Sequence, residues 1–278
     1  MTQPQQAAPS SGYDATGAPP EIGRFVWHDL MTSDGPAAIA FYTALYGWTT
    51  RTLPMGEFGD YTMLHAGEQA IGGIVPMRPA DDNPPSHWIG YATVPSVDAA
   101  CAAVEGLGGA VHVPPTDIPD IGRFAVVADP TGATISPFTA PDGAAAPADG
   151  PDAFGVFCWD ELMSPDPEAS TRFHAGLFGW RWESMDMGPL GVYHLAHRGP
   201  VPAAGLMRLP DEAQAGGARS HWLPYVHVPD VDASYARATE LGARPMVSPR
   251  DIPGIGRFAV FMDPTGAVCA SYRPAPRG

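Results

Sequence analysis

The chain has 278 residues, 45% of them hydrophobic and 16% charged, which is enough to bury one large core or two smaller ones. Thirty Asp and Glu residues outnumber fifteen basic residues, all of them Arg, so the formal net charge is −15. This charge argues against a nucleic-acid or membrane partner, because phosphate backbones and anionic lipid surfaces are themselves negative. No apolar run approaches the ~20 residues that cross a bilayer.

The N-terminal segment and the cysteines bear on the cellular compartment. Residues 1–20 are rich in Gln, Pro, Ala and Ser and have neither the basic nor the apolar part of a signal peptide, so we expect a disordered tail. Cys101, Cys158 and Cys269 are too few and too far apart for a disulfide framework or a paired-cysteine metal site. We therefore expect a cytoplasmic protein with reduced thiols.

The first half of the chain predicts two successive β-α-β-β-β units. The first unit has a strand at 24–31, a helix at 37–46 that starts at a Ser-Asp-Gly-Pro cap and ends at Gly47, and strands at 48–53, 61–65 and 71–77. The second unit has a strand at 87–94, a helix at 97–107 capped by Ser96, and strands at 110–113, 122–128 and 133–138.

The second half of the chain repeats the first. Three segments recur: 25–48 as 157–180, 86–100 as 220–234, and 117–133 as 251–267, the last with 14 of 17 positions identical. The spacing between the copies implies a two-residue insertion near 208–219. Two copies are too few for a solenoid, so we predict a tandem pair of homologous domains.

Composition predicts the domain boundaries. Residues 141–153 are rich in Pro, Ala and Gly, as expected of a linker between the copies. The predicted domains are therefore 21–140 and 154–274, each close to the usual domain size.

Two motifs carry a family resemblance. Phe41-Tyr42-x-x-Leu45-Tyr46-Gly47-Trp48 closes the first helix, and Asp129-Pro130-Thr131-Gly132 precedes the last strand. Both recur, at 173–180 and 263–266. With the paired units they resemble the vicinal oxygen chelate superfamily of glyoxalase I, extradiol dioxygenases and bleomycin- and fosfomycin-resistance proteins, and among these the two-domain actinobacterial antigen proteins. The resemblance implies an α+β fold of tandem glyoxalase-like domains, in which two βαβββ units form a cup-shaped mixed sheet.

The resemblance also implies where a metal would be bound. Catalytic members hold a divalent ion with His, Gln or Glu from the first, fourth, fifth and eighth strands, a donor set that suits Fe, Mn, Ni or Zn. The corresponding residues here are poor ligands: Trp27, Gly73, Ile89 and Ser136 in the first copy, and Trp159, Gly205, Leu223 and Ala270 in the second. We therefore predict no metal or other cofactor, with a divalent metal at misaligned positions as the alternative.

Strand periodicity and recurrence nominate the residues that line the cups. On the first strand these are Trp27, Asp29 and Met31, with Trp159, Glu161 and Met163 in the second copy. The others are Tyr61, His65, His87, Tyr91 and Arg123, with their counterparts Tyr193, His197, His221, Tyr225 and Arg257. His28 has no histidine counterpart and is expected to be exposed or structural.

Each candidate has a structural interpretation as well as a functional one. Trp27 and Trp159 either plug the cups as core residues or stack on a ligand. The carboxyl groups of Asp29 and Glu161 either pair with Arg123 and Arg257 or act as bases or ligand anchors. The recurring histidines, glycine–arginine pairs and Asp-Pro-Thr-Gly turns also fit purely structural roles.

The sequence therefore leads to two functional hypotheses. The first is metal-free binding of a small, partly aromatic organic molecule in resistance, carriage or sensing, with the acidic charge favouring cationic compounds. The alternative is an enzyme of the lyase, isomerase, hydroxylase or oxygenase type. It would use Asp29 and Glu161 with His65 and His197 as acid and base, or a divalent metal. Because the two copies can pair within one chain, we expect a monomer or a homodimer.

Overall fold

The computed structural model describes residues 22–54, 60–77, 85–140, 153–188 and 191–276. The first copy contains β1 (Phe25–Thr32), α1 (Gly35–Tyr46), β2 (Thr49–Pro54), β3 (Asp60–Ala66), β4 (Gln69–Pro76), β5 (His87–Thr93), α2 (Val97–Val104), η2 (Glu105–Leu107), β6 (Ala110–Ile118), β7 (Gly122–Ala128) and β8 (Thr134–Thr139). The second copy contains β9 (Phe157–Ser164), α3 (Pro167–Phe178), β10 (Arg181–Asp186), β11 (Val192–Arg198), β12 (Val201–Arg208), α4 (Asp211–Ala215), β13 (His221–His227), α5 (Val231–Glu240), β14 (Arg244–Ile252), β15 (Gly256–Met262) and β16 (Val268–Pro274).

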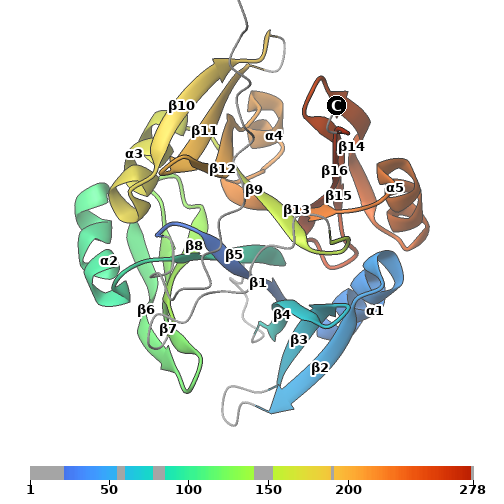
Figure 1. The fold of residues 1–278 in the computed structure, drawn as a ribbon, viewed down its shortest axis with the longest axis horizontal. Coiled ribbons are helices and arrows are strands. Elements are labelled where there is room, and N and C mark those ends of the chain that lie inside the picture. Colours follow the sequence, from blue (N-terminus) through green and yellow to red (C-terminus); the bar gives the residue numbers. More distant parts are fainter. Residues whose placement is uncertain (1–21, 55–59, 78–84, 141–152, 189–190, 277–278) are drawn as a thin grey trace, which may run out of the picture.

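The predicted α+β fold of tandem cup-shaped sheets is confirmed. Each copy forms its own eight-stranded mixed sheet, in the order β2-β3-β4-β1-β5-β8-β7-β6 in the first copy and β10-β11-β12-β9-β13-β16-β15-β14 in the second (Figure 1). At the centre of the first sheet β1 pairs parallel to β4 and antiparallel to β5. In the second sheet β9 pairs parallel to β12 and antiparallel to β13. The predicted tail, residues 1–20, lies outside the described residues, and so does the predicted linker apart from residue 153.

Two elements differ from their predicted extents. β6 continues to Ile118, and its pairing with β7 shifts register twice between Val111 and Thr116, around Pro114 and Pro115. Proline has no amide hydrogen to donate, which accounts for the irregular ladder. The sequence pattern had predicted that this strand ends before the prolines. In the second copy the short helix α4 lies where the insertion was predicted.

Capping residues mark both ends of α1 and α3. The Asp34 side chain caps α1 by accepting from the Ala37 amide, and Asp166 caps α3 in the same way. Both helices end at a glycine in the left-handed region, Gly47 with φ 70° and Gly179 with φ 69°. None of the helices in the described ranges is long and apolar enough to cross a membrane.

Two of the buried hydrophobic clusters contain residues of both copies. α1 packs against α5, and α2 packs against α3 (Figure 1). Two hydrogen bonds between the copies are reciprocal. The Trp48 indole donates to the Gly155 carbonyl at 2.6 Å, and the Trp180 indole donates to the Gly23 carbonyl at 3.0 Å. Equivalent residues thus make equivalent contacts, as across the twofold axis of a symmetric dimer.

One buried polar contact breaks this symmetry. In the first Asp-Pro-Thr-Gly turn, Oδ2 of Asp129 accepts from the Ser170 hydroxyl of α3 at 2.5 Å. In the second turn, Oδ2 of Asp263 is buried and has no hydrogen-bond partner within the described residues. The residue of α1 equivalent to Ser170 is Ala38, which is fully buried. An unpartnered buried oxygen lowers stability, because it loses water without gaining a donor.

We therefore expect Ala38→Ser to raise the free energy of unfolding by about 1 kcal/mol, measured by urea denaturation. The new hydroxyl would give Asp263 the donor that Ser170 gives Asp129. The reciprocal control, Ser170→Ala, is expected to cost about 1–3 kcal/mol. A destabilised Ala38→Ser variant would show that α1 leaves no room for the added oxygen.

Candidate ligand-binding cups

A buried carboxyl group lies at the centre of the first cup. Asp29 is 4% exposed and points away from the helices, because the next residue of β1, Leu30, points into the core beneath α1. Its Oδ1 accepts from the Tyr61 hydroxyl at 2.8 Å and from the Trp27 indole at 3.0 Å. Its Oδ2 accepts from the Tyr91 hydroxyl at 2.8 Å. We refer to Trp27, Asp29, Tyr61 and Tyr91 as the first carboxyl cluster.

The second cup repeats this arrangement with a longer acid. Glu161 is 8% exposed and accepts from the Tyr225 hydroxyl at 3.0 Å. It is also hydrogen-bonded to Tyr193, whose hydroxyl accepts from the Trp159 indole at 3.0 Å. Trp159, Glu161, Tyr193 and Tyr225 form the second carboxyl cluster. The same four positions thus meet in both copies.

Burial governs the protonation of both clusters. Desolvation raises the pKa of Asp29 and of Glu161 above the usual values of 3.8 and 4.5, and the tyrosine hydrogen bonds offset part of this effect. Burial and the nearby carboxyl group also raise the pKa of Tyr61 and Tyr193, so the phenols stay protonated and act as donors. The cups therefore hold acids that retain a proton more readily than acids in water do.

These shifts predict how stability depends on pH. A carboxyl group whose pKa is raised on folding contributes its full stabilisation at a pH below its pKa in the unfolded chain, which is about 4. This contribution is lost as the pH rises through its pKa in the folded protein. The double variant Asp29→Asn, Glu161→Gln has no such groups. We therefore expect wild type to become less stable relative to this variant between pH 4.5 and 8, measured by urea unfolding at each pH. A difference independent of pH would contradict the raised pKa of both acids.

A glycine on the neighbouring strand makes room for each cluster. A Cβ built on Gly73 of β4 would overlap the Tyr61 hydroxyl, and one built on Gly205 of β12 would overlap that of Tyr193. These are the fourth-strand positions at which the family resemblance places a metal ligand. Here the missing side chain lets a phenol reach the central carboxyl group.

Gly73→Ala is accordingly expected to displace the Tyr61 ring and lower the free energy of unfolding by about 1–3 kcal/mol, because the buried Asp29 loses a donor. Urea denaturation measures the change. Gly106→Ala is a matched control, since a Cβ there meets no atom within 4 Å. Equal stability of the two variants would show that the phenol is not held in place.

The recurring histidines lie on the same strand faces but outside the carboxyl clusters. Met31 is opposite His87, and Met163 is opposite His221, further along the paired central strands. Nδ1 of His87 donates to the Pro85 carbonyl and Nδ1 of His221 to the Arg219 carbonyl, each at 2.8 Å. Burial lowers the pKa of both rings, so they are neutral with Nε2 as the acceptor nitrogen.

His65 and His197 are not in hydrogen-bond contact with the acids that were predicted to be their catalytic partners. His65 is opposite Thr49 on β2, toward the sheet edge. His197 approaches the Glu183 carboxyl group of β10 at 3.1 Å instead of Glu161. An acid–base pair of Asp29 with His65, or of Glu161 with His197, therefore has no direct support from the geometry.

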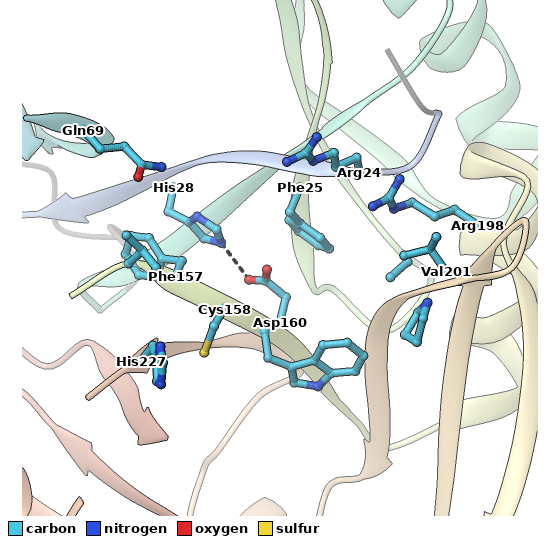
Figure 2. Close-up of a pocket in the computed structure, with 14 residues that line it drawn as sticks. Arg24, Phe25, His28, Gln69, Phe157, Cys158, Asp160, Arg198, Val201 and His227 are labelled. Atoms are coloured by element: carbon cyan, nitrogen blue, oxygen red, sulfur yellow. Dashed lines mark hydrogen bonds and ion pairs between the residues drawn. The ribbon is translucent and has the colours of Figure 1, made fainter. Parts of the chain in front are cut away.

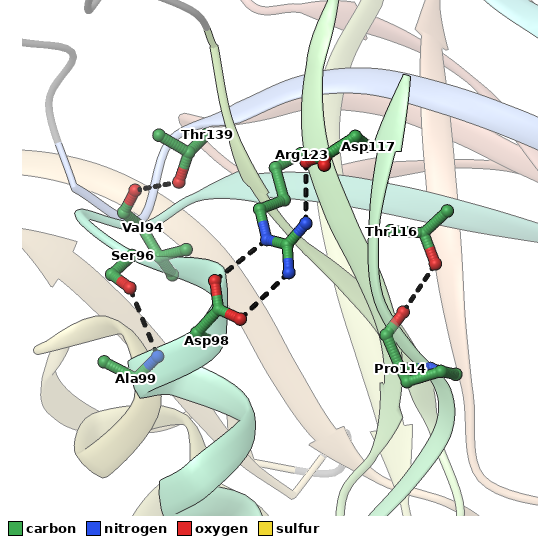
Figure 3. Close-up of polar contacts among 9 residues, drawn as sticks. All are labelled: Val94, Ser96, Asp98, Ala99, Pro114, Thr116, Asp117, Arg123 and Thr139. Carbon is green, nitrogen blue, oxygen red and sulfur yellow. Dashed lines mark hydrogen bonds and ion pairs between the residues drawn. The ribbon is translucent and has the colours of Figure 1, made fainter. Parts of the chain in front are cut away.

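Arg123 and Arg257 require a correction, because the structure places them on the opposite face from the cups. Arg123 shares its face of β7 with the buried Ala125, and binds Asp98 of α2 through Nε at 2.8 Å and Nη2 at 2.9 Å, and Asp117 through Nη1 at 2.7 Å (Figure 3). Arg257 binds Asp232 and Asp251 in the same way. Neither arginine pairs with Asp29 or Glu161.

The residues that face the cups from these strands are their neighbours, which were not predicted. The Phe124 ring lies 6.0 Å from that of Tyr91, and the Phe258 ring lies 6.3 Å from that of Tyr225. Ala125 and Val127 are apolar and small enough for a helix interface. Because strand residues alternate between faces, these two residues could have identified Phe124 as facing the cup.

The donor set at the cup centres does not fit the divalent ion that the resemblance implies. Each cluster offers one carboxyl group, two protonated phenols and an indole, and such phenols and indoles are poor ligands for Fe, Mn, Ni or Zn. In the described ranges no three His, Cys, Asp or Glu residues are grouped so that they could hold a metal.

Comparison with known families agrees with this fold and motif pattern. Residues 22–136 match the model of the glyoxalase/bleomycin resistance protein/dioxygenase superfamily, and residues 157–270 match that of a glyoxalase-like domain. The chain is 35% identical to "Putative glyoxylase CFP32" of Mycobacterium tuberculosis (strain CDC 1551 / Oshkosh), over 90% of this chain and 95% of that protein. The chain belongs to the glyoxalase/bleomycin resistance protein/dioxygenase superfamily. The predicted resemblance is thereby confirmed.

Other members of the superfamily extend the comparison. "Anthracycline biosynthesis protein DnrV" of Streptomyces peucetius is 32% identical, over 91% of this chain and 92% of its own. The Mn(II)-bound glyoxalase from Novosphingobium aromaticivorans aligns with a TM-score of 0.63 and 18% identity, over 91% and 82% of the two chains. The 2,3-dioxygenase LapB of Pseudomonas sp. KL28 aligns with a TM-score of 0.62 and 11% identity, over 94% and 95%. At these identities the solved structures support the fold alone.

Proposed function

We propose that the chain binds small aromatic organic molecules in its two cups, with no metal between protein and ligand. The observation that carries this proposal is the carboxyl cluster, built twice from equivalent positions of the two copies. It includes Trp27 and Trp159, which stand at the first-strand positions where the family resemblance places a metal ligand. Its hydrogen bonds fix two tyrosines and a tryptophan in each cup. A rigid aromatic wall of this kind favours stacking on a planar ligand, because little side-chain entropy is lost on binding.

The surroundings of the first cluster suit such a ligand. Trp27, Tyr61 and Tyr91 are partly exposed, and so is Met31 on the same face. The net charge of −15 favours cationic compounds. An anthracycline, the compound class in the name of the relative DnrV, combines a planar aromatic system with an amino sugar, and we propose ligands of this general kind.

A second candidate function is acid–base catalysis on such a molecule. The raised pKa of Asp29 and Glu161 favours it, because a carboxyl group that retains its proton more readily can donate that proton to a bound molecule. Proton transfer would then be centred on the carboxyl clusters themselves, with the tyrosine hydroxyls as partners.

Isothermal titration of EDTA-treated protein with an anthracycline tests the proposal. We expect up to two sites per chain, and an affinity that does not change when Mn²⁺ or Zn²⁺ is added back. A planar anthraquinone without the amino sugar should bind more weakly, because it lacks the cation. Binding that depends on added metal, or no binding of either compound, would overturn the proposal. Conversion of the ligand, followed by chromatography, would favour the catalytic function.

A further inference from the structure

One buried aromatic pair differs between the copies by a hydroxyl group. In the first copy, the Trp88 indole of β5 donates to the Tyr42 hydroxyl of α1 at 3.2 Å. The repeat replaces Tyr42 by His174 of α3 and Trp88 by Trp222 of β13. His174 is 0% exposed and Trp222 is 4% exposed. The second copy thus buries an imidazole where the first copy buries a phenol.

The rings of the two pairs pack in nearly the same way. The centroids of Tyr42 and Trp88 lie 5.4 Å apart, with an angle of 76° between the ring planes. Those of His174 and Trp222 lie 5.3 Å apart, with an angle of 85°. The imidazole therefore takes the place of the phenol ring, but it carries no hydroxyl group that could accept from the indole.

The neighbour of each indole across the boundary between the copies is repeated as well. Phe157 lies 5.2 Å from Trp88, and Phe25 lies 5.3 Å from Trp222. These two phenylalanines flank the His28 ring where the copies meet (Figure 2). Because both indoles keep the same ring contacts, the second pair has not closed up to compensate for the missing hydroxyl group.

Hydrogen bonding leaves one donor and one acceptor of the second pair without a partner. Nδ1 of His174 donates to the Ser170 carbonyl at 2.8 Å, since a carbonyl oxygen can only accept. Burial lowers the pKa of this imidazole, so it is neutral and its Nε2 is an acceptor. Nε2 of His174 and Nε1 of Trp222 are both buried, and neither has a hydrogen-bond partner among the described residues. Burying both in this way costs free energy, because each loses a hydrogen bond to water on folding.

We propose that the core of the second copy binds one water molecule between His174 and Trp222, at the place that the Tyr42 hydroxyl takes in the first copy. The water oxygen accepts from Nε1 of the indole, and one water hydrogen is donated to Nε2 of the imidazole. A buried water needs room for one oxygen and two to four polar partners. The missing hydroxyl group leaves the room, and the second pair supplies two partners.

This water site is separate from the cups. Trp222 is opposite Leu162 of β9, whose side chain is fully buried in the core that His174 also borders. Glu161, the acid of the second carboxyl cluster, is opposite the next residue of β13, Leu223, and points to the other face of the sheet. The proposal therefore does not depend on what the cups bind.

High-resolution crystal structures of wild type and of His174→Tyr test the proposal. We expect an ordered water within hydrogen-bond distance of His174 Nε2 and Trp222 Nε1 in wild type. His174→Tyr restores the pair of the first copy, so its hydroxyl group should displace the water and accept from the indole directly. A wild-type structure with no ordered water at this place, or with a direct bond between the two side chains, would overturn the proposal without any variant.

Oxygen-17 relaxation dispersion, which counts long-lived internal waters, gives an independent test in solution. His174→Tyr should lower the number of such waters by one. His112→Tyr is the matched control, because it makes the same replacement at an exposed position of β6 and should leave the number unchanged. Urea unfolding checks that both variants are folded. An equal number of long-lived waters in wild type and folded His174→Tyr would contradict the proposed site.

Discussion

Combining Asp29→Asn with Glu161→Gln is expected to weaken binding of an anthracycline about tenfold. The two carboxyl groups are nearly inaccessible, so we assign them a positioning role. Asp29 accepts from Trp27 and Tyr61, and Glu161 is hydrogen-bonded to Tyr193, whose hydroxyl in turn accepts from the Trp159 indole. An amide presents NH donors where a carboxylate presents only acceptors, so part of the network is lost. Losing one charge-assisted bond costs about 1.5 kcal/mol, or roughly a factor of ten in affinity.

The matched control for this double variant is Asp98→Asn with Asp232→Asn. These acids also recur in the repeat and change the net charge equally, but they pair with Arg123 and Arg257 outside the cups. Wild-type affinity should increase as the pH rises through the raised carboxyl pKa, because an ionised acid accepts more strongly. The cup variant should lose this dependence. Unchanged affinity with abolished turnover would instead support acid–base catalysis.

Asp160→Ala is expected to lower the free energy of unfolding by about 3 kcal/mol, measured by urea denaturation. The substitution leaves the buried His28 ring without the group it faces at 2.8 Å, and removing one member of a buried pair is costly. It also opens a void where the two copies meet, beside Phe157.

A surface pair provides the comparison for this second prediction. Arg172→Ala breaks the exposed ion pair between Arg172 and Glu168, which lie one helical turn apart on α3. This loss should lower the free energy of unfolding by less than about 0.5 kcal/mol. A double-mutant cycle over His28 and Asp160 measures their coupling directly. Coupling no larger than that of the surface pair would refute the importance of this contact.

Much of the fold was predictable because its signals are local. Asp34 and Gly47 delimit α1, and the repeat shows each strand twice, so an ambiguous strand in one copy is supported by the other. β6 was predicted too short because its two prolines resemble a strand end, although pairing with β7 carries the strand past them.

The cups were predictable only in part. Alternation along β1 placed Asp29 and Trp27 on one face, and alternation along β3 and β5 added Tyr61 and Tyr91. Arg123 was nominated because its segment recurs, not because of alternation. Alternation from the buried Ala125 places it on the opposite face, where it pairs with Asp98 of α2.

The contact of His28 with Asp160 could not be inferred from either copy alone. Comparison of the copies marked His28 as unmatched, because its counterpart is an acid. Its role depends on how two distant segments dock, which neither periodicity nor spacing encodes.

The meeting of His28 and Asp160 also bears on why the two copies are joined. They occupy equivalent positions of the two copies, and a contact between equivalent residues lies on the approximate twofold axis that relates the copies. In a dimer of identical chains the same residue would face itself there, acid against acid or imidazole against imidazole. Covalent linkage of the copies lets each side of the axis mutate independently, so that unlike partners can face each other. Fusion thus converts a place where symmetry would force identical side chains together into one where an imidazole and a carboxyl group can face each other.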